Sequence, residues 1–125
     1  MIHIFGASYG ILVATKLMMA GYDVVCVCRA EEAELLNKDG FIIKIPGYLN
    51  QPITVFSKSL PGKIFAVEPS DIKKEKISFV FLAMQEAHYS DKNIKDSLLH
   101  VSSKKIPCIS IMNIPPSIYL KNLKN

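Results

Sequence analysis

The first residues with binding chemistry form the turn at residues 6–11, Gly-Ala-Ser-Tyr-Gly-Ile, which follows a short apolar run. It occupies the place of the dinucleotide fingerprint GxGxxG, whose glycines allow a tight turn, close approach of the backbone to a pyrophosphate and close packing of helix on strand. Gly6 matches the first glycine, Ser8 and Ile11 replace the others, and Gly10 stands beside the last position. The alternative is a turn with a purely structural role. The pattern predicts dinucleotide contacts from Gly6, Ala7, Ser8, Tyr9 and Gly10.

A second residue with binding chemistry is Arg29, which ends the β-branched run at residues 24–28. A unit selective for NAD normally carries an acid there, because a carboxylate holds the ribose hydroxyls. A guanidinium instead suits a 2′-phosphate, so Arg29 favours NADP as the cofactor. The alternative is an exposed arginine that pairs only with Glu31 or Glu32.

Later strands of the predicted sheet end at Met84-Gln85 and at Asn113. Ligands of open α/β sheets lie at the carboxyl ends of the strands, so Met84, Gln85 and Asn113 are predicted to lie beside the cofactor. His88 could serve as an acid at the same edge, but a surface histidine at the start of a helix is the favoured interpretation. No metal site is expected, and no tyrosine is followed four residues later by the lysine of a short-chain dehydrogenase dyad.

Alternating strands and helices must position these residues. Apolar runs predict core strands at residues 2–5, 24–28, 41–45, 77–83 and 107–112. Helical spacing predicts helices at residues 9–20, 31–39 and 90–101, the last with Ser90 or Asp91 as N-cap, and Pro115-Pro116 opens another. The β-rich pieces at residues 53–56 and 63–67, beside Pro-Gly turns, predict an antiparallel excursion.

This order of elements predicts an α/β fold, with a doubly wound, mainly parallel sheet of the Rossmann type and an antiparallel excursion between its third and fourth strands. Residues 1–125 are expected to form a single domain, because the chain has the length of one domain and half of it is apolar.

Composition excludes several classes of protein. The apolar runs are too short to span a bilayer and no basic segment precedes the first of them, so we expect a cytoplasmic protein without a membrane partner. The net charge of +4 comes from scattered lysines without an arginine cluster among aromatics, so no nucleic-acid partner is expected. Cys26, Cys28 and Cys108 lie in apolar runs and are predicted to be buried thiols.

Three stretches, residues 2–8, 21–29 and 79–85, resemble the N-terminal domain of the ketopantoate reductase family, and the similarity runs to about Leu123. Members of that family reduce 2-dehydropantoate to pantoate with NADPH, using a Rossmann domain followed by an all-helical domain. The resemblance implies that Gly6 begins the cofactor turn, that Arg29 meets the 2′-phosphate, and that Asn113 lies near the nicotinamide and the substrate.

The sequence departs from the family's pattern at Gln85, where a lysine is usual, and at Ile114, where a glycine is usual. The resemblance also implies a catalytic lysine and a substrate-binding acid in the helical domain, which has no counterpart in residues 1–125. We therefore expect an NADP(H)-binding domain that is inactive alone. The alternative is a non-catalytic interaction or regulatory module that no longer binds a dinucleotide. A helical partner domain or a homodimer is expected to cover an apolar face of the domain, for which the last helix, with Ile118, Tyr119 and Leu120, is one candidate.

Overall fold

The computed structural model of the chain describes residues 1–7, 9–84 and 86–111. Five parallel strands form one sheet in the order β5-β2-β1-β6-β7. Their bounds are β1 Ile2–Phe5, β2 Val24–Val27, β5 Ile64–Val67, β6 Phe79–Leu82 and β7 Cys108–Ser110. The order reverses between β1 and β6, which confirms the predicted doubly wound α/β fold and places the switch point between these two strands.

Helices α1 (Gly10–Met19) and α2 (Ala30–Asp39) cover one face of the sheet. Side chains at alternate positions of β2 point to the same face, and there α1 packs Ala14 and Met18 against Ile4 and Val24. Further along that face, α2 packs Ala33 and Leu36 against Cys26, Cys28 and Ala66. The buried positions of each helix recur every three or four residues, as expected for one apolar stripe.

The opposite face is covered by α3 (Lys92–Ser103) and by the 3-10 helix η3 (Pro69–Lys74). The Asp91 side chain accepts hydrogen bonds from the backbone N–H groups of Asn93 and Ile94, which confirms one of the two predicted N-caps. The cluster on this face joins strand residues to helix residues: Phe5, Val27, Val80 and Leu82 with Ile72, Ile94, Leu98 and Val101. The sheet is therefore covered on both faces.

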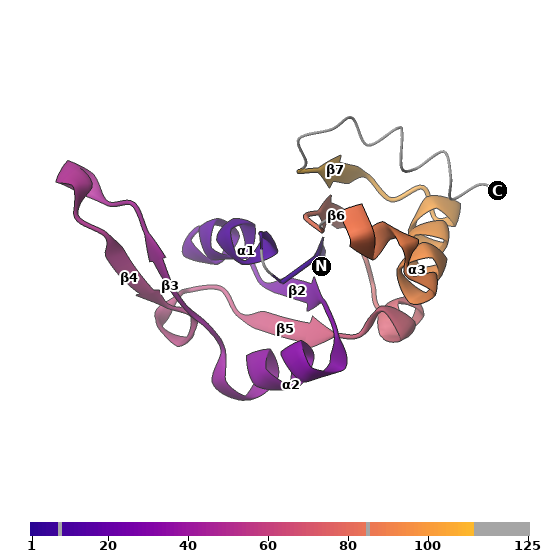
Figure 1. Cartoon of the computed structure of the whole chain (residues 1–125), viewed down its shortest axis with the longest axis horizontal. Coiled ribbons are helices and arrows are strands. Elements are labelled where there is room, and N and C mark those ends of the chain that lie inside the picture. Colours follow the sequence, from indigo (N-terminus) through magenta and orange to yellow (C-terminus); the bar gives the residue numbers. More distant parts are fainter. Residues whose placement is uncertain (8, 85, 112–125) are drawn as a thin grey trace.

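An antiparallel excursion exists, but the prediction of its strands as residues 53–56 and 63–67 is wrong for the second of them. Strand β3 (Ile42–Ile45) pairs antiparallel with β4 (Ile53–Phe56) in a separate hairpin, which projects away from the sheet in Figure 1. The third core strand is instead β5, which pairs with β2. The isoleucines of β3 suggested burial, yet Ile42 is 68% exposed because nothing in the described chain covers that side of the hairpin. Short 3-10 helices, η1 (Tyr48–Asn50) and η2 (Ser57–Ser59), flank β4.

Hydrogen bonds from outside the sheet hold β5 in its place. The Asn37 side chain, on α2, donates to the Ala66 carbonyl and accepts from the Ala66 N–H, both at 2.8 Å. Asp23 accepts from the Lys63 N–H at 2.8 Å, just before the strand begins. Since β5 is an outer strand, the Asn37 amide satisfies backbone groups that would otherwise lie open at the sheet edge.

Three predicted binding residues, Ser8, Gln85 and Asn113, lie outside the described residues, as does the predicted helix from Pro115. Within the described ranges, none of the helices combines the length and the apolar character needed to cross a membrane.

Buried His3 makes the stability of the fold pH-dependent. Its Nδ1 lies 3.2 Å from the Met1 carbonyl oxygen and its Nε2 lies 3.9 Å from a Glu75 carboxylate oxygen. Burial lowers the pKa of His3, and the hydrogen bond with the Met1 backbone and the Glu75 charge only partly offset this effect, while the amino terminus adds to it. Below about pH 6.5 the unfolded chain therefore binds more protons than the folded chain, and stability is lost as the pH falls.

We expect the free energy of unfolding to fall by up to about 1 kcal/mol between pH 7 and pH 5.5 because of His3. Urea titrations at both pH values measure this loss, and the His3→Gln variant is the control, since glutamine has no proton to gain. Equal losses in the two proteins would assign the pH dependence to other groups.

Candidate functional site

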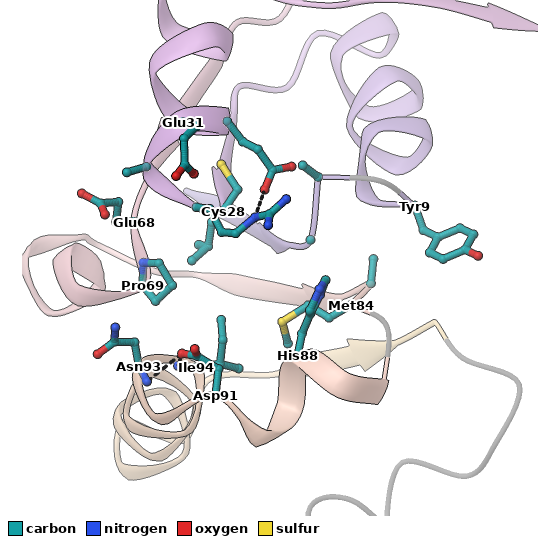
Figure 2. A pocket seen from close by; sticks show the side chains of 17 residues that line it. Tyr9, Cys28, Glu31, Glu68, Pro69, Met84, His88, Asp91, Asn93 and Ile94 are labelled. Atoms are coloured by element: carbon teal, nitrogen blue, oxygen red, sulfur yellow. Dashed lines mark hydrogen bonds and ion pairs between the residues drawn. The ribbon is translucent and has the colours of Figure 1, made fainter.

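A cleft of about 580 Å³ lies at the carboxyl ends of β1, β2, β5 and β6 (Figure 2). The start of α2, the 3-10 helix η4 (Glu86–Ser90) and the start of α3 complete its rim. This volume is within the range of small-molecule and cofactor sites, and the position beside the β1/β6 switch point is where open α/β sheets bind ligands.

The turn after β1 is built closely against the end of β6. Gly6 has a φ of +106°, and a Cβ at this position would lie 2.6 Å from the backbone oxygen of Ala83. The Gly6 N–H donates to the Val27 carbonyl at 3.1 Å, and the Ala83 N–H donates to the Phe5 carbonyl at 2.9 Å. Only glycine fits this conformation and this spacing, so the first glycine of the fingerprint has its expected structural role.

Gly10 takes over the packing role of the fingerprint's last glycine. It is the first residue of α1 and is buried, and a Cβ there would lie 2.6 Å from the Ile4 side chain. Ile11, at the fingerprint position itself, turns instead toward the cluster under α2. The departure at Ile11 therefore leaves close contact between α1 and β1 intact.

Most of the predicted binding residues that the structure describes line one cleft. Its walls include Gly6, Ala7, Tyr9, Arg29 and Met84, whereas Gly10 lies behind the turn and does not line it. Met84 is also part of the hydrophobic cluster on the α3 face. Contact between these residues and a dinucleotide stays a prediction.

Arg29 lies at the end of β2 and is held by a neighbour. Its Nε donates to a Glu32 carboxylate oxygen at 3.0 Å, with the two side chains 79% and 36% exposed. The hydrogen bond and the charge of Glu32 raise the pKa of Arg29, so the guanidinium stays charged. The ion pair that the sequence left open as an alternative is thus present, although both residues also line the cleft.

Carboxylates outnumber basic groups around the described cleft. Arg29 and His88 face the acidic side chains of Glu31, Glu32, Glu68 and Asp91. Asp91 is engaged in capping α3, and Glu32 in pairing with Arg29. A polyanionic ligand would therefore depend on Arg29 and on backbone N–H groups for its binding.

Cys26 of β2 and Cys28, which follows this strand, belong to the same cluster under α2, and Cys28 also lines the cleft. A hydrogen bond between the two thiols raises the pKa of Cys26 and lowers that of Cys28, and burial adds to the first shift while opposing the second. The burial predicted for Cys26 and Cys28 is confirmed, but that for Cys108 is wrong. Cys108 lies on the outer strand β7, where the described chain leaves it exposed.

Sequence reasoning missed the residues that reach the cleft from β5 and α3. Glu68 and Pro69 follow β5, and Asn93 lies in the first turn of α3. Recognition of β5 as a core strand would have placed Glu68 and Pro69 at the ligand edge by the same rule that selected Arg29. His88, from η4, lines the cleft beside Met84 (Figure 2).

The described residues fit a dinucleotide in two respects. The turn after β1 lines the cleft with two small residues, Gly6 and Ala7, and the end of β2 presents one guanidinium. No cluster of three or more His, Cys, Asp or Glu side chains suitable for a metal ion is found in the part of the chain described above.

Comparison with models of known protein families supports the family resemblance of the sequence. The sequence model described as "Ketopantoate reductase PanE/ApbA" matches residues 2–113, a range that includes all strands and helices of the described residues. A comparison with curated proteins found no match.

Proposed function

Because the chain belongs to the ketopantoate reductase family, we propose that it binds NADPH in the cleft at the carboxyl ends of its parallel strands. The observation that carries this proposal is the Gly6 turn. Its positive φ and its contact with the Ala83 backbone exclude any side chain, as the tight turn that begins a dinucleotide fingerprint requires.

The proposal gives four of the cleft residues a role. Gly6, Ala7 and the backbone leading into α1 would face the pyrophosphate, and Arg29 would face the 2′-phosphate. Met84 would lie beside the cofactor at the end of β6. When bound, NADPH supplies a hydride for the reduction of a carbonyl substrate. Ser8, Gln85 and Asn113 remain predicted contacts by their positions in the sequence.

Titration with NADPH, followed by nicotinamide fluorescence and by calorimetry, tests the proposal directly. We expect saturable binding of one cofactor per chain. An alternative function is a non-catalytic interaction module, which is favoured by the carboxylates around the cleft and by the pairing of Arg29 with Glu32. The absence of saturable binding at millimolar NADPH would select that alternative.

Replacement of Arg29 by alanine tests the choice of cofactor. A charge-assisted contact between the guanidinium and a 2′-phosphate predicts that Arg29→Ala weakens NADPH binding by about ten- to a hundredfold. NADH has no 2′-phosphate, so its dissociation constant should change by less than about twofold. Four dissociation constants, for two cofactors and two proteins, measure the difference. Equal losses of affinity for both cofactors would refute the preference for NADP but not dinucleotide binding itself.

Chemical modification of Cys28 gives an independent view of cleft occupancy. Cys28 lines the cleft, whereas Cys108 is exposed on β7 and does not. At an NADPH concentration about ten times its dissociation constant, we expect alkylation of Cys28 by N-ethylmaleimide to slow by about tenfold, because only the free chain reacts. Mass spectrometry of proteolytic digests measures the rates at both cysteines. An unchanged rate at Cys28, or equal slowing at Cys108, would contradict binding in this cleft.

A further inference from the structure

The end of β2 carries one positive charge surrounded by several negative ones. Glu32 accepts a hydrogen bond from Arg29 Nε at 3.0 Å, and Glu31 precedes it in the first turn of α2. Glu68 enters the same cleft from the end of β5, and its charge, like that of Glu32, partly opposes the lowering of the Cys28 pKa by the hydrogen bond with Cys26. The formal net charge of Arg29, Glu31, Glu32 and Glu68 together is negative. Of these four side chains, only that of Arg29 attracts a phosphate.

We propose that Glu32 is a specificity-determining residue, which competes with the 2′-phosphate of NADPH for the Arg29 guanidinium and so narrows the preference for NADPH over NADH. This inference rests on the proposed function, since it concerns the same cleft and the same cofactor. Glu32 acts on the cofactor through Arg29 and takes no part in catalysis.

The competition follows from charge and geometry. A phosphate monoester carries about −1.5 to −2 charges near neutral pH. If it approaches Arg29, the Glu32 carboxylate must either give up its hydrogen bond or remain beside a second anion. Both outcomes weaken NADPH binding. The 2′-hydroxyl of NADH is neutral and can donate to a carboxylate, so NADH does not meet this penalty.

The size of the effect is limited by solvent. Both side chains are open to water, and exposed ion pairs are weak and screened by salt. We therefore expect Glu32→Gln to tighten NADPH binding by about three- to tenfold at low ionic strength, and by less at 0.5 M salt. The dissociation constant of NADH should stay within about twofold or rise slightly, because a carboxylate acceptor is lost.

Glu34→Gln is the matched control. Glu34 lies on the same helix, is exposed and does not line the cleft, and its replacement changes the net charge by the same amount. It should alter either dissociation constant by less than about twofold. A gain with Glu34→Gln equal to that with Glu32→Gln would show a general charge effect and overturn the proposal.

A double-mutant cycle separates competition for Arg29 from simple repulsion. In the Arg29→Ala background, the gain in NADPH affinity from Glu32→Gln should shrink to less than about twofold, because no guanidinium is left to compete for. An undiminished gain in that background would refute the proposed competition.

The outcomes also distinguish this proposal from the one it rests on. If the parent chain binds NADPH and Glu32→Gln leaves its affinity unchanged, the competition is refuted and the proposed function stands. If neither the parent chain nor the variant binds NADPH or NADH, the proposed function fails and the competition fails with it. If Glu32→Gln binds NADPH more tightly than the parent chain and NADH no more tightly, the result supports both the proposed function and the competition.

Discussion

The 125-residue chain is expected to leave NADPH unoxidised when ketopantoate is added, even under conditions in which NADPH is bound. Reduction of the ketone needs a proton donor for the new alkoxide, and the resemblance assigns this role to a lysine of the helical domain. General acid catalysis typically contributes about 10²- to 10⁴-fold to a rate. The decrease in NADPH absorbance measures turnover, with a ketopantoate reductase that contains both domains as the positive control.

His88 supplies a way to interpret any turnover that is seen. It lies in η4, just after β6, and lines the cleft, and histidine side chains often act as general acids in catalysis. Slow oxidation of NADPH that disappears in His88→Ala would identify this histidine as a local acid. Rapid oxidation by the 125-residue chain would contradict the expectation of an inactive cofactor domain.

Gly6→Ala should remove both stability and NADPH binding. Its φ of +106° strains any other residue, and the added Cβ would meet the Ala83 backbone at 2.6 Å, where no flexible side chain could move aside. We expect the free energy of unfolding to fall by about 3 kcal/mol, the sum of backbone strain and overpacking, as measured by urea titration. Where the variant remains folded, the displaced turn should lower NADPH affinity by at least about tenfold.

Gly21→Ala is the matched control for this effect. Gly21 has a similar φ of +94°, but no atom lies within 4 Å of the position of its Cβ. This variant therefore carries only the backbone strain, about 1–2 kcal/mol, and should bind NADPH as the parent does. Equal losses of unfolding free energy in Gly6→Ala and Gly21→Ala would show that the close approach of Gly6 to β6 does not contribute to stability. That result would contradict the role assigned to the turn.

The fold was predictable where the signal is local. The apolar run at residues 2–5, the helical spacing after it and the β-branched run at residues 24–28 define β1, α1 and β2, because each pattern depends on neighbouring residues alone. The N-cap Asp91 is local in the same sense. The third strand was not predictable in this way, since the runs at residues 41–45 and 64–67 are both short and β-rich.

What decided between those two runs is a set of contacts across the chain. Asn37 binds the Ala66 backbone from α2, and Asp23 binds the Lys63 N–H, so that β5 lies beside β2 and β3 is left in the hairpin. These contacts join residues that are 29 and 40 positions apart. Periodicity carries no information about such pairing, because the energy that selects the partner is released only when distant segments meet.

For the candidate site, the sequence by itself determined the glycine turn, the arginine after β2 and the edge of the sheet at which they would meet. These follow from residue type and from the rule that parallel strands end at one edge. Only the tertiary structure decided that Gly10 packs on Ile4, that Glu68 enters the cleft and that Glu32 holds Arg29. The first two depend on how distant elements pack together, which chain order leaves undetermined. The third depends on which of two nearby carboxylates, Glu31 or Glu32, faces Arg29 in the first turn of α2.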